Sequence, residues 1–350
     1  MTTKRSRPIV VGGSNFDVIC QVNEALETNA STVNAKVRTC FGGVGRNLAD
    51  GLALLDSNPI FISAVGNDHL GRCILSQNSK LDKSHVLIRN DKSTATYCLT
   101  LDTLGDLKHG IGDMEIHQSI QPEDIWALQN VIENEASMVV LDANFSDQTV
   151  DCILQLCHSC QIPVFFEPTD PRKACKAVKS AYASAIHFAS PNIHELRLMA
   201  DSVVSEKNQQ ISTPLPPRAE DEDNLEALLK ECTSLGRILM QKMPFATLVI
   251  TLGKHGALLI EPPTGEAEAE KTGGGEGEGN TCHFNCVVEQ DQNSIVSASG
   301  AGDCLAAAFI SGLLRGLDRR QALRLGLKAA RLSLNAIEAV PETLSTLNHE

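Results

Sequence analysis

The stretch SASGAGDCLAAAFISGLLRG, residues 297–316, indicates a glycine-rich turn that leads directly into a helix. Gly300, Ala301 and Gly302 carry little or no side chain, and Asp303 follows them at once. The apolar residues after Asp303 recur at helical spacing. The first backbone N–H groups of such a helix are uncovered, and with the helix dipole they attract a phosphate group or a developing oxyanion. The stretch therefore predicts an anion site.

Asp303 has two interpretations. It fits an ordinary capped helix start, because short glycine-rich turns are common and aspartate is favoured there. A carboxylate would also repel the anion that the turn attracts. That conflict disappears if Asp303 removes a proton from a hydroxyl group while the N–H groups hold the phosphoryl group under attack. The second interpretation predicts phosphoryl transfer.

Length and composition favour one large α/β domain, and we expect residues 1–350 to form it. The net charge of −13 and an aromatic content of 4% argue against nucleic acid or an anionic membrane as a partner. We find neither an apolar run long enough to span a membrane nor a signal peptide, so we expect a cytoplasmic protein. Residues 205–224 and 262–281 are acidic and of low complexity, which predicts disordered surface insertions.

Twelve cysteines are scattered along the chain, mostly where an apolar residue would be expected. They are best interpreted as reduced core residues. The alternative is a zinc site drawn from the Cys157–Cys160 and Cys282–Cys286 clusters, each of which includes a histidine.

Helix and strand patterns alternate in the middle of the chain, which predicts an α/β fold. Apolar runs such as MVVLD and VFFEP are typical of parallel strands covered on both faces. The expected helices are 125–134, 147–160 and 171–179, and the expected strands are 138–142, 163–167 and 185–189. Asp142, Asn144, Glu167 and Asp170 come just past strand ends, where ligands bind in open α/β sheets.

The N-terminal part of the chain predicts a second group of polar residues at a strand end. Asn15 and Asp17 follow a short strand expected over residues 8–13. The turn GGVGRN, residues 42–47, opens a helix on which Gly43 and Asn47 lie one turn apart. The dinucleotide fingerprint and the P-loop are both missing, which disfavours a dinucleotide-binding oxidoreductase.

Residues 95–102 and 107–115 alternate between polar and apolar, which predicts a hairpin. Together with segments near residues 16–40 it would form a small β-sheet lid, with lid strands within about 16–40 and 94–116. Asp113 stands at the end of this hairpin.

Two further motifs have a simple alternative. Asn192 and Glu195, three residues apart, could be a plain helix cap. Thr251 ends an expected strand, and the following Gly253 and Gly256 form either a β-turn or a turn that brings amides against a nucleotide phosphate. The last helix is expected over residues 321–338 and would pack on the sheet.

The chain resembles the ribokinase (PfkB) family of sugar and nucleoside kinases. GAGD before a small-residue helix is similar to the second signature of that family, and GGVGRN with AVGNDHLG, residues 64–71, is similar to the first. The resemblance implies a three-layer α/β/α fold with a mostly parallel central sheet and a small β lid. It also implies ATP and Mg²⁺ as cofactors and a primary alcohol as the acceptor.

The resemblance also implies roles for matching positions. Asp303 would be the catalytic base, with Gly300, Ala301 and Gly302 around the transferred phosphate. The substrate side would comprise Asn15, Asp17, Gly42, Gly43, Asn47, Asp113 and Asn144. The ATP side would comprise Asn192, Thr251, Gly253 and Gly256, and Glu195 would hold Mg²⁺ through water.

Within the family, GGVGRN, the Gly112–Asp113–Met114 lid end and Asp142–Ala143–Asn144 resemble pseudouridine kinases. The preferred substrate is therefore pseudouridine, phosphorylated at its 5′-hydroxyl, with ribose or another nucleoside as the alternative. A ligand-binding relative that has lost catalysis is an alternative of another class. Ser297 stands where the family commonly has an acid that helps to hold a monovalent cation, which puts K⁺ activation in doubt. A homodimer through the lid would also fit the family.

Overall fold

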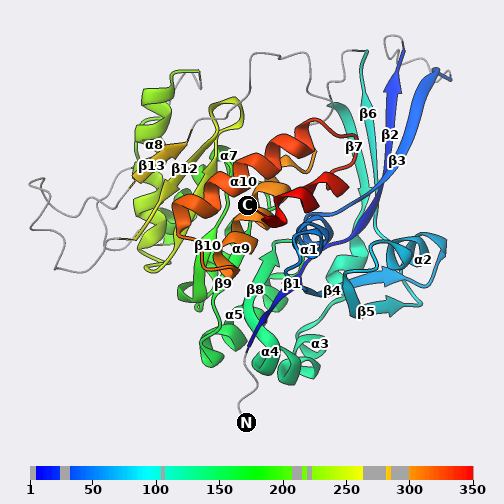
Figure 1. Cartoon of the computed structure of the whole chain (residues 1–350), viewed down its shortest axis with the longest axis horizontal. Helices are drawn as coiled ribbons and strands as arrows, with labels where there is room; N and C mark the ends of the chain where they lie inside the picture. The colour runs from blue at the N-terminus through cyan, green and yellow to red at the C-terminus, as the bar shows by residue number, and fades with distance from the viewer. Residues whose placement is uncertain are drawn as a thin grey trace, which may run out of the picture.

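The computed structural model describes residues 5–23, 32–103, 107–206, 215–218, 223–262, 281–284 and 299–349. The two acidic segments predicted as disordered insertions lie for the most part outside these residues, and so does Ser297. The rest of the chain forms two sheets and the helices that cover the larger one (Figure 1).

The larger sheet has nine strands among the described residues, in the order β13-β12-β11-β10-β9-β8-β1-β4-β5. They are β1 (Arg7–Val11), β4 (Ile60–Gly66), β5 (Asp82–Arg89), β8 (Ala136–Asp142), β9 (Val164–Glu167), β10 (Ile186–Ala189), β11 (Thr247–Thr251), β12 (Ala257–Ile260) and β13 (Thr281–Phe284). From β11 to β5 in this order, each strand pairs in parallel with the next one. At the other edge of the sheet, β12 pairs antiparallel with both β11 and β13. The mostly parallel sheet predicted from the apolar runs is confirmed.

Helices cover both faces of this sheet. They are α1 (Val44–Leu54), α2 (His69–Ser76), α3 (Pro122–Ala127), α4 (Gln129–Glu135), α5 (Asp147–Cys160), α6 (Cys175–Lys179), α7 (Ile193–Glu206), α8 (Leu225–Met240), α9 (Ala301–Leu314) and α10 (Arg319–Leu334). Successive residues of a strand face opposite sides, so Ile9 and Val11 pack with α3 to α8 while Val10 packs with α1, α9 and α10. This is the expected three-layer α/β/α arrangement, and Figure 1 shows α1, α9 and α10 on the near side of the sheet.

The smaller sheet has the order β3-β2-β6-β7 and rises at the upper right of Figure 1. Its strands are β2 (Asn15–Val22), β3 (Ala35–Gly42), β6 (Thr96–Leu101) and β7 (Leu107–Asp113). β6 and β7 pair antiparallel, as the alternation of polar and apolar residues predicted. β2 joins this hairpin to β3, pairing in parallel with β6 and antiparallel with β3.

Several helix bounds differ from the predictions. The helix expected over residues 125–134 is two helices, α3 and α4, because Leu128 caps the end of α3 and the start of α4. α3 begins at Pro122, after a capping box of Gln121 and Asp124. The helix expected over 171–179 is shortened to α6, and residues 171–174 before it form turns. The last helix is α10, which starts after the capping residue Asp318 and ends four residues before position 338.

Candidate active site

Helix α9 begins at Ala301, and its preceding residue, Gly300, has the left-handed conformation with a φ of 83°. A Cβ atom on Gly300 would lie 2.3 Å from the carbonyl oxygen of Ala339. Only glycine satisfies both the positive φ and this close approach. The start of the helix is therefore fixed against the segment that follows α10.

The body of α9 is buried on every side from Cys304 to Gly312. Helices α1 and α10 approach α9 closely through glycines of their own. A Cβ on Gly51 of α1 would lie 2.7 Å from the Cβ of Ala307, and a Cβ on Gly326 of α10 would lie 2.8 Å from the carbonyl oxygen of Leu305. By contrast, Ala301 and Gly302 in the first turn are exposed or half-buried, and no atom lies within 4 Å of a Cβ built on Gly302. A rigid helix thus presents an open amide terminus.

Asp303 lies in that first turn with its side chain partly exposed. The Asn47 side-chain amide donates to its Oδ2 atom at 2.7 Å. Desolvation by the surrounding protein and, to a smaller extent, the charge of Asp142 raise the pKa of Asp303 to about 6, against the opposing effect of the Asn47 hydrogen bond. Asp303 can therefore hold or release a proton close to neutral pH.

The glycine-rich turn before α1 brings Asn47 to this place. Gly43 has a φ of 95°, and its carbonyl oxygen accepts from Asn47 N at 2.8 Å. A Cβ on Gly45 would lie 2.3 Å from the Cα atom of Gly12, so the turn packs directly on the end of β1. The turn at residues 12–13 and the turn at residues 42–45 are far apart in the sequence but pack against each other beside Asp303. We call the surface that they form the floor of the site.

Asn15 and Asp17 stand on β2 at the edge of that floor. The Asn15 side-chain amide donates to Asp17, and a Cβ on Gly42 would lie 2.1 Å from Asp17 Oδ2. Burial raises the pKa of Asp17 to about 6, although the Asn15 hydrogen bond and the charge of Arg46 oppose the rise. Asn15, Asp17, Gly42, Gly43 and Asn47 are thus brought together, and their roles toward a substrate stay predictions.

The carboxyl end of β8 completes the floor. Asn144 Nδ2 donates to Asp142 at 2.8 Å, and a Cβ on Gly13 would lie 2.7 Å from the same Nδ2 atom. Asp113 is different, because it lies exposed at the end of β7 opposite Thr96, and β6 separates it from β2. Among the described residues no hydrogen bond or ion pair joins Asp113 to the floor.

Asn192 and Glu195 form a reciprocal helix cap at the start of α7. Asn192 N donates to Glu195 Oε2 and Glu195 N donates to Asn192 Oδ1, both at 2.9 Å. Thr251 lies beside them, since its N–H donates to the Pro191 carbonyl at 3.0 Å. The plain capping alternative therefore describes their contacts in this structure, and the same contacts place Asn192, Glu195 and Thr251 together at the strand ends.

Gly253 begins a short 3₁₀ turn after β11, η3 (Gly253–His255), and Gly256 follows that turn. Gly253 has a φ of 55° and Gly256 a φ of 84°, and nothing lies within 4 Å of a Cβ on Gly253. The turn reverses the chain into β12 and leaves room above Gly253.

Acidic side chains gather between the two halves of the site. Burial and the neighbouring charges of Glu195 and Asp303 raise the pKa of Glu167 well above its ordinary value. Burial likewise raises the pKa of Glu195, with smaller contributions from Asp170 and Asp303. Such mutual repulsion is relieved by a cation. No group of three His, Cys, Asp or Glu side chains in the described part of the chain is arranged to hold a metal ion directly.

Two polar residues of the floor were missed by the sequence analysis. His117 is buried in the 3₁₀ helix η1 (Glu115–Ser119), and its Nε2 atom lies 3.2 Å from the Ser14 carbonyl oxygen. Burial lowers its pKa, and because a carbonyl can only accept, Nε2 carries the proton. Lys173 Nζ donates to Asn144 Oδ1 at 2.6 Å. The basic run that follows the strand expected over residues 163–167 was the one signal for Lys173, and nothing marked His117.

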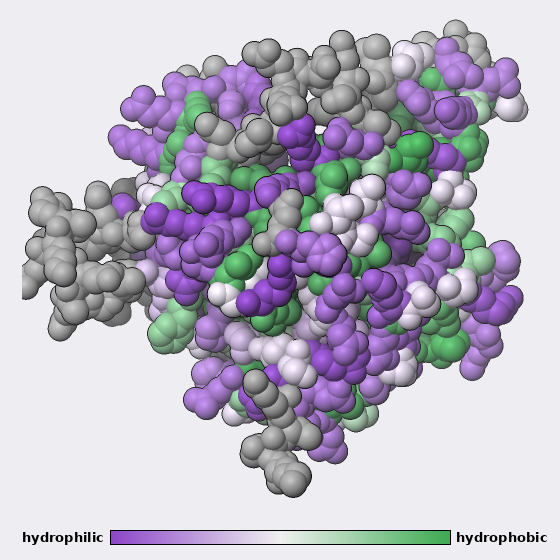
Figure 2. Space-filling model, viewed as in Figure 1, coloured by the Kyte–Doolittle hydropathy of each residue, from purple (hydrophilic) through white to green (hydrophobic). Residues whose placement is uncertain are grey.

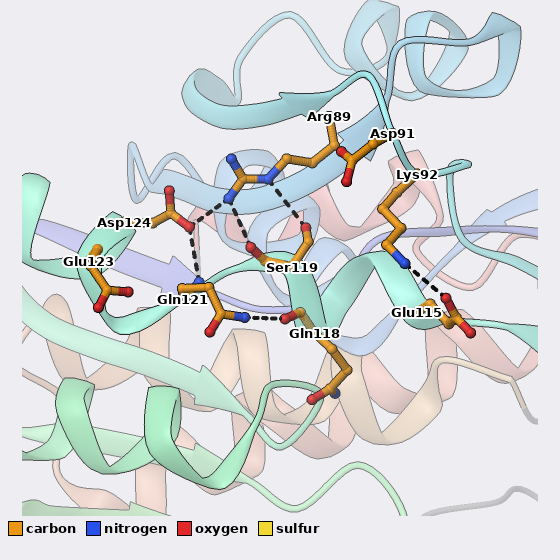
Figure 3. Close-up of a pocket in the computed structure, with 9 residues that line it drawn as sticks. All are labelled: Arg89, Asp91, Lys92, Glu115, Gln118, Ser119, Gln121, Glu123 and Asp124. Carbon is orange, nitrogen blue, oxygen red and sulfur yellow. Dashed lines mark hydrogen bonds and ion pairs between the residues drawn. The ribbon is translucent and has the colours of Figure 1, made fainter.

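A cleft of about 810 Å³ is lined by residues of β5, η1 and α3 and of the loops beside them (Figure 3). Arg89 there is paired with Asp124 and Lys92 with Glu115. Its cationic side chains are thus neutralised by neighbouring acids. The glycine floor with its two half-buried aspartates is the better candidate for chemistry.

Eleven cysteines in the described part of the chain are free thiols. Cys157 is buried, and burial raises its pKa above the ordinary range, which disfavours the thiolate that zinc binds. Cys286 of the second predicted cluster lies outside the described residues. Within the ranges that the structure describes, no helix is long and apolar enough to cross a membrane.

Comparisons with known proteins agree with this geometry. Pseudouridine kinase from Arabidopsis thaliana is 26% identical over 359 residues, which covers 95% of this chain and 92% of that protein. Pseudouridine kinase from Escherichia coli (strain K12) is 31% identical over 201 residues, which covers 56% of this chain and 62% of that protein. The solved structure of ribokinase from Cryptococcus neoformans in complex with ADP has a TM-score of 0.74 at 17% identity and covers 98% of this chain and 99% of that one, so it shares the fold.

The model of pfkB family carbohydrate kinases matches residues 7–344, nearly the whole chain. Both ends of the site, the glycine floor after β1 and the amide terminus of α9, fall inside the match. The protein is therefore a member of the pfkB carbohydrate kinase family, a phosphotransferase that acts on an alcohol group.

Proposed function

We propose that this kinase transfers the γ-phosphoryl group of ATP to the 5′-hydroxyl group of pseudouridine. The observation that carries the proposal is the contact between Asn47 and Asp303. It joins the floor that would hold a nucleoside to the helix terminus that would hold the phosphoryl group.

Asp303 would act as the base. With its pKa raised to about 6, the carboxylate is ionised at neutral pH yet accepts a proton more readily than an ordinary aspartate. It would take the hydroxyl proton as that oxygen attacks phosphorus. The amides around Gly300, Ala301 and Gly302, at the positive end of the α9 dipole, would stabilise the oxygens of the transferred group.

The floor would bind the ribose. Asp17 and Asn15 are polar groups that can exchange hydrogen bonds with ribose hydroxyls. Gly42 and Gly43 let the turn pack closely against these side chains, because a Cβ on either glycine would collide with them. Asn47 would position Asp303 and Asn144 would contact the nucleoside. Asp113, at the lid end, would reach the substrate only if the small sheet closes over it.

The other half of the site would bind ATP. Asn192, Thr251, Gly253 and Gly256 would border the nucleotide, with the open space above Gly253 available to phosphate. Glu195 would hold Mg²⁺ through water, and Mg²⁺ when bound would neutralise charge on the phosphates. The crowding of Glu167, Glu195 and Asp303 is a negative environment that suits such an ion.

The choice of pseudouridine rests on two pseudouridine kinases among the relatives and on the GGVGRN turn. Arg46 in that turn pairs with Asp50, lies over the Phe41 ring with its guanidinium carbon 5.6 Å from the centroid, and donates to the Phe41 carbonyl at 2.6 Å. It thereby fixes the turn against β3. Ribose or another nucleoside remains the second candidate.

A panel of acceptors tests this choice. We expect kcat/KM with pseudouridine to exceed that with ribose, uridine and adenosine by at least about tenfold, which corresponds to about 1.4 kcal/mol of transition-state binding. ATP consumption and product formation would be measured with each acceptor. A higher kcat/KM with ribose would replace pseudouridine while leaving the kinase class intact.

The pH dependence of the rate tests the two half-buried aspartates. Asp303 and Asp17 both have pKa values raised to about 6, and both are required as carboxylates. We expect kcat/KM to fall below about pH 6, with a limiting slope of log(kcat/KM) against pH close to two. In Asp17→Asn the slope is expected to decrease to one. If kcat/KM of the wild type instead fell only around pH 4, the roles assigned to Asp303 and Asp17 would be contradicted.

We further propose that the enzyme is cytoplasmic and forms a homodimer through the lid. Two exposed apolar residues support the second idea: Val37 on β3 and Ile111 on β7, with 59% and 73% of their surfaces accessible. Figure 2 shows hydrophobic patches over the small sheet within a mostly hydrophilic face. Burying such residues on the edge strands would protect open sheet edges.

A further inference from the structure

Asp142 at the end of β8 is fully buried and accepts four hydrogen bonds. Its Oδ2 atom accepts from Gly13 N at 2.7 Å, from Gly45 N at 2.9 Å and from Asn144 Nδ2 at 2.8 Å. Its Oδ1 atom accepts from Asn144 N at 3.0 Å. Every one of these donors belongs to the floor of the site or borders it.

The donors come from segments that are distant in the sequence. Gly13 precedes Asn15 and Asp17 on β2, and Gly45 lies in the first turn of α1, two residues before Asn47. Gly45 and Asp142 are separated by 97 positions and Gly13 and Asp142 by 129. One carboxylate therefore joins the end of β1, the start of α1 and the end of β8.

The surroundings of Asp142 stabilise a negative charge. No ion pair involving Asp142 occurs among the described residues, so its charge is stabilised by backbone and amide donors and by the amino end of the eleven-residue helix α1. An asparagine would present one acceptor oxygen, and its NH₂ group would face N–H donors. A neutral isostere therefore fits this position poorly.

We propose that Asp142 is a positioning residue for phosphoryl transfer: it holds the nucleoside floor and, through α1, the Asn47 side chain in register with Asp303. This inference rests on the proposed role of Asp303 as the base. Asp142 itself touches neither reacting atom in the proposed mechanism.

Asp142 also acts on Asp303 through charge. Its carboxylate raises the pKa of Asp303. The other titratable groups that face Asp303 are Glu167 on β9 and Glu195 on α7, and Cys304 adjoins it on α9. Removing the Asp142 charge alone should therefore shift the acidic limb of the rate profile to lower pH, by about 0.5 to 1 pH unit. Loss of geometry alone would lower the rate without moving that limb.

The test compares full-length Asp142→Asn with Asp147→Asn. Asp147 is an exposed acid five residues further on, so its replacement makes the same change in net charge away from the site. We expect Asp142→Asn to lower kcat/KM about 100-fold and to shift the acidic limb downward. Asp147→Asn should do neither. Thermal melts would confirm that both variants are folded.

The outcomes separate this inference from the proposed function. If the wild type phosphorylates no sugar or nucleoside, the proposed function fails. If the wild type is active and Asp142→Asn keeps its rate, the positioning role fails. If the variant loses rate but its acidic limb does not move, the effect of the Asp142 charge on Asp303 fails. Should Asp142→Asn not fold, ¹³C-carboxyl titration of the wild-type protein replaces it. Asp303 should then titrate near pH 6, and Asp303 titrating near pH 4 would overturn the inference.

Discussion

Replacing Asp303 by asparagine is expected to lower kcat about 100- to 10,000-fold, the range that general base catalysis contributes. Asparagine has nearly the same shape and can still accept from Asn47, so binding of ATP and nucleoside should change little. The measurement is steady-state kinetics with ATP and pseudouridine, with single-turnover experiments to isolate chemistry. A variant that retains more than about a tenth of the wild-type kcat would exclude Asp303 as the base.

The same substitution is expected to stabilise the fold. The folded-state pKa of Asp303 is raised to about 6 from an ordinary value of 3.8, so between these values the folded state binds more protons than the unfolded state. The contribution of Asp303 to the free energy of unfolding therefore rises as the pH falls through 6 toward 4. At pH 7, Asp303→Asn should raise the free energy of unfolding by about 1 to 3 kcal/mol, after allowance for partial exposure. Urea unfolding at pH 7 and pH 4 should show this gain shrinking at the lower pH.

Gly300→Ala is expected to have the second large effect. The left-handed conformation of Gly300 costs a residue with a Cβ about 1 to 2 kcal/mol, and the Ala339 carbonyl at 2.3 Å from that atom adds an overpacking cost of about 1 to 3 kcal/mol. Because the first turn of α9 must then move, kcat/KM should fall about 100-fold.

Two alanine variants serve as matched controls for Gly300→Ala. Gly316 also has a positive φ, of 85°, but no atom lies within 4 Å of its Cβ position, so Gly316→Ala should lose only the conformational cost and no activity. Gly302→Ala meets open space inside a helix and should not reduce stability. If Gly300→Ala behaved like Gly316→Ala in both assays, the close approach to Ala339 would not matter for the site.

The sequence predicted those parts of the fold and site that depend on local patterns. Continuous apolar runs identified β8 and β9, alternation identified the β6–β7 hairpin, and GAGD marked the start of α9. The sequence pattern of residues 42–47 correctly predicted that Gly43 and Asn47 lie one helical turn apart, because this spacing depends only on local structure. Helix boundaries were less accurate where a cap decides them, as at Gln121 and Asp318.

The remainder depends on contacts between distant segments. Asp142 was noticed only as a polar residue past a strand end, since its bonds to Gly13 and Gly45 exist only once β1, α1 and β8 are adjacent. His117 was missed for the same reason. The roles assigned to Asn192, Glu195 and Asp113 came from the family resemblance, and they stay predictions, because the cap contacts and the exposed lid end do not by themselves bind a nucleotide or a nucleoside.

The most direct test of the account is a crystal structure with pseudouridine and a non-hydrolysable ATP analogue. We predict that the 5′-hydroxyl oxygen lies about 2.6 to 3.2 Å from the Asp303 carboxylate and that the terminal phosphate lies against the amides at the start of α9. A terminal phosphate beyond hydrogen-bonding reach of those amides, or a hydroxyl group held by another carboxylate, would contradict it.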